Sequence, residues 1–247
     1  MIDILPSDPY TPAMIELNGV TKQYGALAAV DHVSFRVEPG ESFALLGPNG
    51  AGKTTIVKML LDFTRPSSGS LSVNSIDCAK PASRAAIGYL AENQRIPPHL
   101  TGWQYLRRNA ELLGMNSREA DEQCRRTVGE IGMAGREHTK AGTYSKGMVQ
   151  RFGLGAALVG RPKLLLLDEP TSGLDPIGIR ETRQLLDALK KEGTTIFLNS
   201  HLLSEVEKIC DNAAIIHQGK LLVADAIANL VRDGETLEDV FVRLVKG

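Results

Sequence analysis

The chain has 247 residues, 43% of them hydrophobic, and its 28 basic and 29 acidic side chains give a formal net charge of -1. This size and composition are typical of a globular protein with one large domain, or with a core that carries a subdomain. The balanced charge excludes a general attraction to nucleic acid or to an anionic membrane, so any partner has to be recognised by a local surface. The longest apolar runs are far shorter than the ~20 residues that a membrane-spanning helix needs.

The beginning of the chain and its cysteines indicate a protein of the cytoplasm. Residues 1–13 contain acidic residues and prolines but no basic region of the kind that opens a signal peptide, so we expect a flexible extension. The three cysteines, Cys78, Cys124 and Cys210, are widely spaced and match no metal-ligand pattern. We expect them to be small core or surface residues in a reducing compartment, rather than ligands or disulfide bridges.

Strand-like runs alternate with helical segments over the first and last thirds of the chain. A helix is expected from Lys53 to about Phe63, and strands are expected over 15–20, 33–37, 42–46, 70–73, 87–90, 164–168, 194–199, 213–217 and 221–223. This alternation predicts an α/β fold with a mostly parallel sheet that helices cover on its faces.

The middle of the chain is helical. Helices are expected over 101–113, 117–131 and 145–159, with no convincing strand among them. We therefore predict a helical subdomain over 91–160, inserted into an α/β core that consists of 14–90 and 161–225.

The C-terminal segment, 226–247, is also predicted to be helical. Its apolar residues recur at helical spacing over 236–245, and Thr236 and Asp239 are placed as a capping box. We expect this helix to dock back on the core through its apolar face.

A glycine-rich run between an expected strand and an expected helix fits the phosphate-loop pattern G-x-x-x-x-G-K-[ST]: Gly47-Pro48-Asn49-Gly50-Ala51-Gly52-Lys53-Thr54. In such a loop the backbone N–H groups converge on phosphate oxygens, and the helix N-terminus adds its positive end. We expect Lys53 to reach the β- and γ-phosphates of ATP, Thr54 to offer its hydroxyl to Mg²⁺, and Thr55 to help hold the phosphates. The alternative is a glycine-rich turn with a purely structural role.

A second run, 164–167, is entirely leucine and ends in two acids, Asp168 and Glu169. Buried parallel strands present such residues at the carboxyl edge of a sheet, where ligands bind. We expect Asp168 to hold Mg²⁺ and Glu169 to polarise the water that attacks the γ-phosphate. Taken alone, an Asp-Glu pair is more often a solvated strand end.

These two motifs together indicate a P-loop NTPase, and four further motifs resemble those of the ABC ATPase family. Tyr144-Ser145-Lys146-Gly147-Met148, followed by Gln150-Arg151, resembles the family signature, which usually reads Leu-Ser-Gly-Gly-Gln. The run 172–175 resembles the D-loop, His201 the switch histidine, and Tyr24 the aromatic residue that stacks on adenine. Each has a structural alternative: Tyr24 as a packed strand aromatic, His201 as a helix-cap or core histidine, and Ser145 as an N-cap.

The resemblance extends from Ile15 to about Val223 and implies an ATP-hydrolysing subunit of an ABC transporter. The implied fold is a P-loop NTPase core with a mostly parallel sheet, an antiparallel portion near the N-terminus and an inserted helical subdomain. The implied cofactors are ATP and Mg²⁺. The implied partners are a separate transmembrane permease and a second ATP-binding subunit, with a homodimer expected and no nucleic acid. The chain is then expected at the inner face of the cell membrane, as a peripheral protein.

The implied mechanism pairs two chains head to tail, so that each ATP lies between one phosphate loop and the other chain's signature. Glu169 and His201 are the expected catalytic residues, and Thr54, Asp168 and Glu92 the expected metal ligands. The expected nucleotide contacts are Tyr24, Gly47, Pro48, Asn49, Gly50, Ala51, Gly52, Lys53, Thr54, Thr55, Glu92, Ser145, Gly147 and Asp175.

The sequence departs from the family pattern at three places. Lys146 and Met148 replace a glycine and the glutamine of the signature, and Glu92 stands where the Q-loop usually has glutamine. With the runs 174–178 and 201–206, these departures resemble the exporter branch of the family.

Other classes stay open at this point. Chromosome-maintenance ATPases of this type separate the phosphate loop from the signature by long coiled coils, and translation types carry two cassettes, whereas this chain has neither feature. A small-molecule kinase would share the phosphate loop only, and a nucleotide-binding regulator would bind ATP without hydrolysing it. The apolar segment 96–100 is expected either to dock a helix of the membrane partner or to pack under the helices around it.

Overall fold

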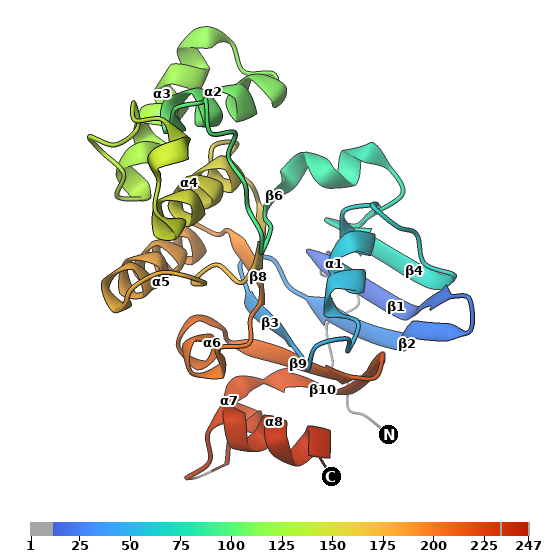
Figure 1. Cartoon of the computed structure of the whole chain (residues 1–247). Helices are drawn as coiled ribbons and strands as arrows, with labels where there is room; N and C mark the ends of the chain where they lie inside the picture. The colour runs from blue at the N-terminus through green and yellow to red at the C-terminus, as the bar shows by residue number, and fades with distance from the viewer. Residues whose placement is uncertain (1–11, 233, 247) are drawn as a thin grey trace. The chain divides into compact units, whose positions relative to one another are not determined.

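The computed structural model describes residues 12–232 and 234–246, and the extension expected over 1–13 therefore lies almost wholly outside the described residues. By its internal contacts the chain divides into two compact units (Figure 1). The first unit runs to Ala85 and resumes at Gly193, and the second is Ala86–Glu192. The domain boundaries expected from the sequence stay a prediction. No helix within the described residues has the length and hydropathy that crossing a bilayer requires.

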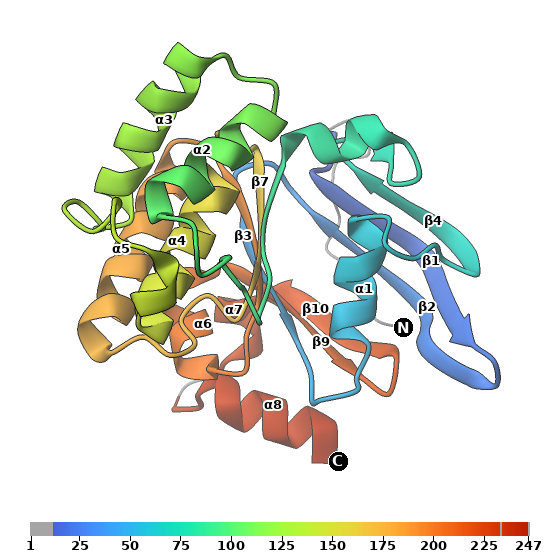
Figure 2. The same ribbon diagram turned by 45° about the horizontal axis from the view of Figure 1, so that its top comes forward.

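The first unit contains an antiparallel sheet near the N-terminus, as expected. Its strands lie in the order β2 (Leu27–Val37), β1 (Ile15–Tyr24), β4 (Ser68–Val73) and β5 (Ile76–Asp77). Each neighbouring pair is antiparallel. The helix α1 (Lys53–Leu60) packs against β2 and β4, as Figure 2 shows.

The same unit contains four strands of a second, mostly parallel sheet, in the order β10 (Lys220–Ala226), β9 (Asn212–His217), β3 (Ser42–Leu46) and β8 (Thr195–Asn199). β3 is parallel to β8 and to β9, whereas β10 is antiparallel to β9. Every residue of β3 and of β8 is buried, in keeping with the apolar residues that fill the middle of both strands.

Three stacked aromatic rings join these strands to β2. The ring centroids of Phe35 and Phe43 lie 5.3 Å apart, and those of Phe43 and Phe197 lie 5.8 Å apart. All three side chains are at most 2% exposed. Stacked rings at this spacing contribute beyond the area that they bury, so this cluster fixes β3, the strand that leads into the glycine-rich loop.

The C-terminal segment is helical and docks as expected. It contains α7 (Ile227–Leu230) and α8 (Leu237–Lys246), and α8 packs against α6 (Leu203–Ile209). The predicted capping box forms at the start of α8: the N–H of Thr236 donates to Oδ2 of Asp239 at 2.9 Å, and the N–H of Asp239 donates to Oγ1 of Thr236 at 3.2 Å. The N–H of Leu237 donates to Oε1 of Glu207 on α6 at 2.5 Å, and this bond ties α8 to α6.

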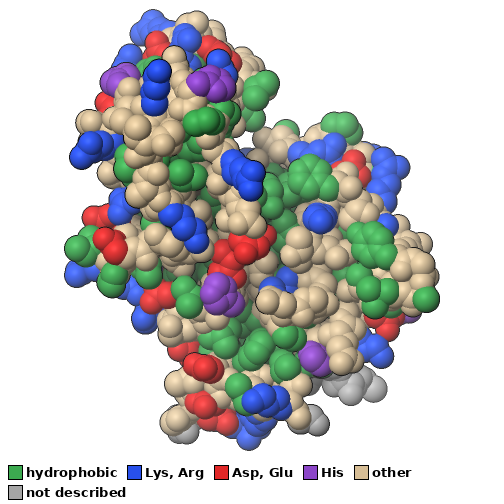
Figure 3. Space-filling view, viewed as in Figure 1, with side chains coloured by type: hydrophobic (Ala, Val, Ile, Leu, Met, Phe, Trp, Pro, Cys, Tyr) green, Lys and Arg blue, Asp and Glu red, His purple; other side chains and the backbone are tan. Residues whose placement is uncertain are grey.

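The second unit is mostly helical. Two parallel strands, β6 (Ile87–Leu90) and β7 (Leu164–Asp168), flank a segment that contains α2 (Gly102–Leu112), α3 (Ser117–Glu130) and α4 (Lys146–Leu158). α4 packs against α2, α3 and β6, and α5 (Pro176–Lys191) follows β7. Figure 3 shows basic and acidic side chains interspersed over the part of the surface that α2 and α3 form, in keeping with the balanced charge of the sequence.

Capping boxes at both helix starts explain why α2 and α3 begin where they do. Thr101 and Gln104 bond reciprocally at the start of α2, and Asn116 and Glu119 do so at the start of α3. Each box satisfies backbone N–H groups that a helix N-terminus would otherwise leave without a partner.

Candidate functional site

The glycine-rich loop connects β3 to α1, which is the arrangement that a phosphate loop requires. Gly52 is the N-cap of α1 and has φ 109°, in the region that favours glycine. A Cβ at this position would also collide with the carbonyl oxygen of Ala29, so the loop needs glycine here for two reasons. Asn49 and Gly50, at the tip of the loop, are exposed. The backbone amides of the loop are thereby available at the N-terminus of α1, where anions bind.

Lys53 turns its ammonium group into this loop. Its Nζ donates to the carbonyl oxygens of Gly47 at 2.5 Å and Pro48 at 3.2 Å. The charge therefore lies over the residues that open the loop, within reach of a phosphate group held by the loop amides. Thr54 is exposed and Thr55 is half-buried at the start of the same helix, so both hydroxyls are placed at its N-terminal end.

His201 lies near the same edge of the first unit's sheet. β3 and β8 are parallel, and Leu45 pairs with Asn199, so both strands reach their carboxyl ends together. The phosphate loop leaves β3 at this edge, and His201 follows two residues after Asn199. The imidazole is exposed, which argues against the alternative of a core histidine. Ligands of open α/β sheets bind at this edge.

Tyr24 is the last residue of β1 and keeps much of its ring in solvent. Its side chain is 49% exposed, and Nζ of Lys22 lies 5.1 Å from the ring centroid. The alternative of a ring packed in the sheet therefore does not hold. An exposed aromatic face of this kind is suited to stacking on a base.

The second unit places its acidic candidates at one strand edge. β6 and β7 are parallel, and Leu90 pairs with Leu167. Asp168 and Glu169 therefore stand at the same carboxyl edge as the segment that carries Glu92. Asp168 is 6% exposed and Glu169 is 8% exposed, whereas Glu92 is exposed. Asp168 and Glu169 are thus not a solvated strand end, and burying two carboxylates requires polar partners or a cation.

The pKa of Tyr89 is raised in part by the negative charges at this edge. Burial raises the pKa of its phenol, and the charges of Asp168 and Glu92 raise it further. The carboxylates of β7 and of the segment after β6 therefore act on a common neighbour, which supports a shared electrostatic environment at this edge.

These carboxylates fit a magnesium ion that takes further ligands from phosphate and water. Asp168 and Glu92 supply hard oxygen donors, the class of ligand that Mg²⁺ prefers. Within residues 12–232 and 234–246, no group of three or more His, Cys, Asp or Glu side chains is placed to hold a metal by itself. Mg²⁺ is commonly held by one or two carboxylates together with substrate phosphates, so this donor set suits it.

The signature residues form the exposed N-terminus of α4. Ser145 is the N-cap, and its Oγ accepts from the N–H of Met148 at 3.2 Å. The expected structural role of Ser145 is therefore present, and it leaves the side chain exposed. The preceding Tyr144 anchors the turn: its ring stacks on Phe152 at 5.1 Å, and its hydroxyl accepts from the N–H of Gly102 at 2.9 Å.

Asp175 caps the next helix. Its Oδ1 accepts from the N–H of Gly178 at 2.7 Å, and Pro176 occupies the first turn of α5. This cap explains the run Asp-Pro in structural terms. Asp175 is exposed, as the expected role at an interface between two chains also requires.

Gln150, which was quoted with the signature in the sequence but given no role there, contacts the expected base. Gln150 is only 4% exposed, and its Nε2 donates to the carbonyl oxygen of Glu169 at 3.0 Å. Buried polar groups need hydrogen-bond partners, so a glutamine on the buried face of α4 was the available signal.

The apolar side chains of the segment 96–100 do not form an exposed docking surface in the structure. Ile96 is 8% exposed and Leu100 is 4% exposed, so the two apolar side chains belong to the core. The alternative, packing under the helices, is correct for both. Pro97, Pro98 and His99 between them are exposed.

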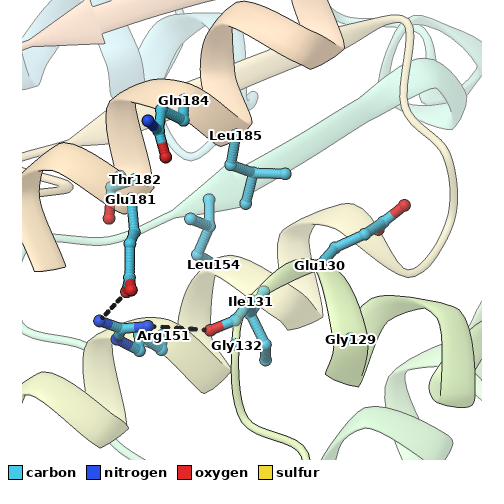
Figure 4. A pocket seen from close by; sticks show the side chains of 10 residues that line it. All are labelled: Gly129, Glu130, Ile131, Gly132, Arg151, Leu154, Glu181, Thr182, Gln184 and Leu185. Carbon is cyan, nitrogen blue, oxygen red and sulfur yellow. Dashed lines mark hydrogen bonds and ion pairs between the residues drawn. The ribbon is translucent and has the colours of Figure 1, made fainter.

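A cavity of about 350 Å³ lies in the second unit and is lined in part by Arg151, which follows the signature (Figure 4). Arg151 crosses it, with Nη2 2.7 Å from Oε2 of Glu181 and Nη1 donating to the carbonyl oxygen of Ile131 at 3.3 Å. None of the residues expected to bind nucleotide lines this cavity, so it is distinct from the candidate site.

Comparisons with known proteins agree with these motifs. The family model described as "ABC transporter" matches residues 30–172. The bacitracin transport ATP-binding protein BcrA of Bacillus licheniformis is 41% identical, over 85% of this chain and 68% of that protein. The lantibiotic transport ATP-binding protein SrtF of Streptococcus pyogenes is 34% identical, over 92% of this chain and 96% of that protein.

A solved structure has the same fold. The structure titled as an ATP-binding subunit of an ABC transporter superposes with a TM-score of 0.86 at 29% identity, over 94% of this chain and 99% of that one. The exposed phosphate loop, the buried carboxylates at the end of β7 and the signature turn of α4 are thus found in a chain whose relatives are named as transport ATP-binding proteins. The chain belongs to the ABC transporter family, and within that family it is an ATP-binding subunit, an ATPase.

Proposed function

We propose that the chain binds ATP with Mg²⁺, pairs head to tail with a second copy, and couples ATP hydrolysis to export through a separate transmembrane permease. The observation that carries this proposal is the pair of buried carboxylates, Asp168 and Glu169, at the end of a strand in a chain that also has a phosphate loop with Lys53. Buried acids at a ligand-binding edge are suited to metal binding and to base catalysis.

The phosphate loop and Tyr24 bind the nucleotide. The loop amides and Lys53 hold the phosphates, Thr55 assists them, and the exposed ring of Tyr24 stacks on adenine. Thr54, Asp168 and Glu92 hold Mg²⁺, which when bound neutralises negative charge on the β- and γ-phosphate oxygens.

Glu169 orients the attacking water and accepts a proton from it. Its burial keeps water other than the nucleophile away from the carboxylate, and the backbone contacts of the residue fix its position. His201 acts as the switch residue, because an imidazole N–H is a donor suited to a γ-phosphate oxygen.

The signature turn acts on the partner's nucleotide. Ser145 and the N–H of Gly147 lie at the exposed N-terminus of α4, which is suited to an anion, and Asp175 is exposed on the following helix. Two identical chains arranged head to tail give each ATP one phosphate loop and one signature turn. Loss of the γ-phosphate removes the bridge, and the pair opens.

The proposals of a separate permease and of export are based on similarity to other proteins. BcrA and SrtF are named as bacitracin and lantibiotic transport proteins, and the departures at Lys146, Met148 and Glu92 resemble the exporter branch. The chain then works as a peripheral protein at the inner face of the cell membrane, with the substrate path in the permease.

The proposed function is tested by replacing Glu169, the proposed base. The full chain with Glu169→Gln is expected to bind ATP as the parent does but to lose most of its turnover, because the amide keeps the shape and cannot accept the proton. The variant is then expected to accumulate as a dimer in gel filtration with ATP and Mg²⁺. Glu238→Gln, the same change at an exposed carboxylate of α8, is the control and leaves turnover unchanged.

Parental turnover in Glu169→Gln would show that another group is the base. A variant that stays monomeric while its bound ATP is confirmed would contradict the head-to-tail pairing.

A further inference from the structure

Lys146 links the signature turn to the loop that follows the proposed base. It is the first residue of α4 and stands where the family usually has glycine. Its Nζ lies 3.2 Å from Oγ of Ser172, which is three residues after Glu169. A glycine at position 146 has no side chain to make this contact, so the link is a property of this sequence rather than of the signature motif.

The stem of the same lysine covers Gly173. A Cβ built on Gly173 would lie 2.5 Å from Cδ, 2.7 Å from Cε and 2.9 Å from Cγ of Lys146. A side chain at position 173 would push the lysine stem aside, and φ 76° at Gly173 lies in the region that favours glycine. The methylene groups of the lysine therefore pack directly on the backbone of the turn, while the charged end reaches Ser172.

A further contact ties the same pair of segments. Nε2 of Gln150, one turn further along α4, donates to the carbonyl oxygen of Glu169 at 3.0 Å. The first turns of α4 and the loop 169–174 are therefore held together at both ends, by Lys146 at one and by Gln150 at the other.

We propose that Lys146 is a positioning residue of the ATPase reaction. Its contacts with Ser172 and Gly173, here called the clasp, hold the 172–173 turn against the signature turn, and so position the loop that carries Glu169. The proposal rests on the proposed function, in which Ser145 and Gly147 meet the partner's ATP and Glu169 serves the chain's own. The clasp then joins groups that belong to two different ATP sites, and both sites depend on one lysine.

The test uses the full chain with Lys146→Met, Lys146→Arg, Ser172→Ala and the double variant Lys146→Met/Ser172→Ala. Methionine keeps most of the stem and removes the donor, and arginine keeps a donor. Lys191→Met, at an exposed lysine in the last turn of α5, is the matched control. Turnover gives kcat and KM for ATP, and urea unfolding gives the free energy of unfolding of each variant.

The clasp predicts that Lys146→Met lowers kcat by about threefold, as expected for one exposed polar contact, with little change in KM for ATP. Ser172→Ala is expected to give the same loss. The double variant is expected to lose no more than either single variant, because the two side chains act through one contact. Lys146→Arg restores most of kcat. If Lys146 had only a structural role, Lys146→Met would lower the free energy of unfolding, but it would not lower kcat while leaving KM for ATP unchanged.

Two results would overturn the proposal. Parental kcat in Lys146→Met would mean that the clasp does not matter for the reaction. A raised KM for ATP in Lys146→Met with a silent Ser172→Ala would mean that the ammonium group binds the partner's γ-phosphate directly.

The measurements also distinguish an error in the proposed function from an error in the role proposed for Lys146. If Glu169→Gln keeps parental turnover, the role given to Glu169 is wrong. The coupling between Lys146 and Ser172 in the free energy of unfolding still shows whether the clasp exists, and additive effects there would reject it.

Discussion

The side chain of Gln150 bonds to the backbone of Glu169, with 3.0 Å between Nε2 and the carbonyl oxygen. The same oxygen also accepts from the N–H of Ser172 at 3.1 Å. Glu169 has φ 53°, in the left-handed region that costs a residue other than glycine roughly 1–2 kcal/mol. The two donors therefore hold the proposed base in a backbone conformation that it would not adopt by itself, which is a common arrangement at functional sites.

We predict that Gln150→Met lowers kcat while KM for ATP changes little. Methionine fills a similar volume but cannot donate, so a buried carbonyl loses one partner and Glu169 is held less firmly. The free energy of unfolding should fall by about 0.5–1.5 kcal/mol, the usual net contribution of one hydrogen bond, because the carbonyl oxygen keeps the N–H of Ser172 as a partner. Gln184→Met, at an exposed glutamine of α5, should leave both quantities at the parental value. Equal turnover in Gln150→Met and the parent would mean that this contact does not position the base.

We predict that Tyr24→Ala raises KM for ATP by about tenfold, because stacking on a base contributes ~1–3 kcal/mol. Tyr24→Trp should keep or improve binding, since a larger ring offers more surface for stacking. The matched control is Leu27→Ala, because Leu27 pairs with Tyr24 across β1 and β2 and is 67% exposed. A KM that rises equally in Leu27→Ala would show that the hairpin, rather than the ring, determines binding.

We predict that Cys78 and Cys124 resist alkylation in the native chain. Burial raises the pKa of the Cys78 thiol from 9.0 to about 12 and that of Cys124 to about 11, so at pH 8 almost no reactive thiolate is present. In urea both should react quickly. Mass spectrometry of alkylated peptides measures each site separately, and rapid labelling of either cysteine in the native chain would contradict its burial.

The same shift determines how stability depends on pH. A thiol whose pKa is raised on folding keeps its proton longer in the folded state than in the unfolded state. Its contribution is fully present below pH 9.0, the ordinary value, and is lost as the pH rises towards about 12. The free energy of unfolding is therefore expected to fall over this range, and Cys78→Ser should make the fall smaller.

Much of the fold could be predicted because its strongest signals are local. The run 42–46 is apolar from Phe43 onwards and is followed directly by the glycine-rich loop, and the predicted bounds of β3 agree with the structure. β1 continues to Tyr24 although only 15–20 was predicted. Its last residues are polar and form part of the strand because they pair with β2 and β4, a tertiary effect that alternation in the sequence does not reveal.

The contacts that support the site were harder to predict. Gln150 and Glu169 lie 19 positions apart, and neither residue type identifies the other as its partner. Lys146 was visible as a departure from the family pattern, but only the structure shows that its stem covers Gly173. The apolar character of Ile96 and Leu100 was compatible with an exposed docking surface and with burial, and only the structure shows that both side chains are buried.

The most direct measurement of the central claim is ATP turnover by the full chain with Lys53→Ala. The ammonium group of Lys53 lies in the phosphate loop, and its removal is expected to lower kcat/KM by a factor of about 100 or more, as for other charge-stabilising groups in a protected site. The control is Lys58→Ala, an exposed lysine further along the same helix, which should keep parental turnover. Parental turnover in Lys53→Ala, with Lys58→Ala also unchanged, would contradict the assignment of this loop as the ATP site.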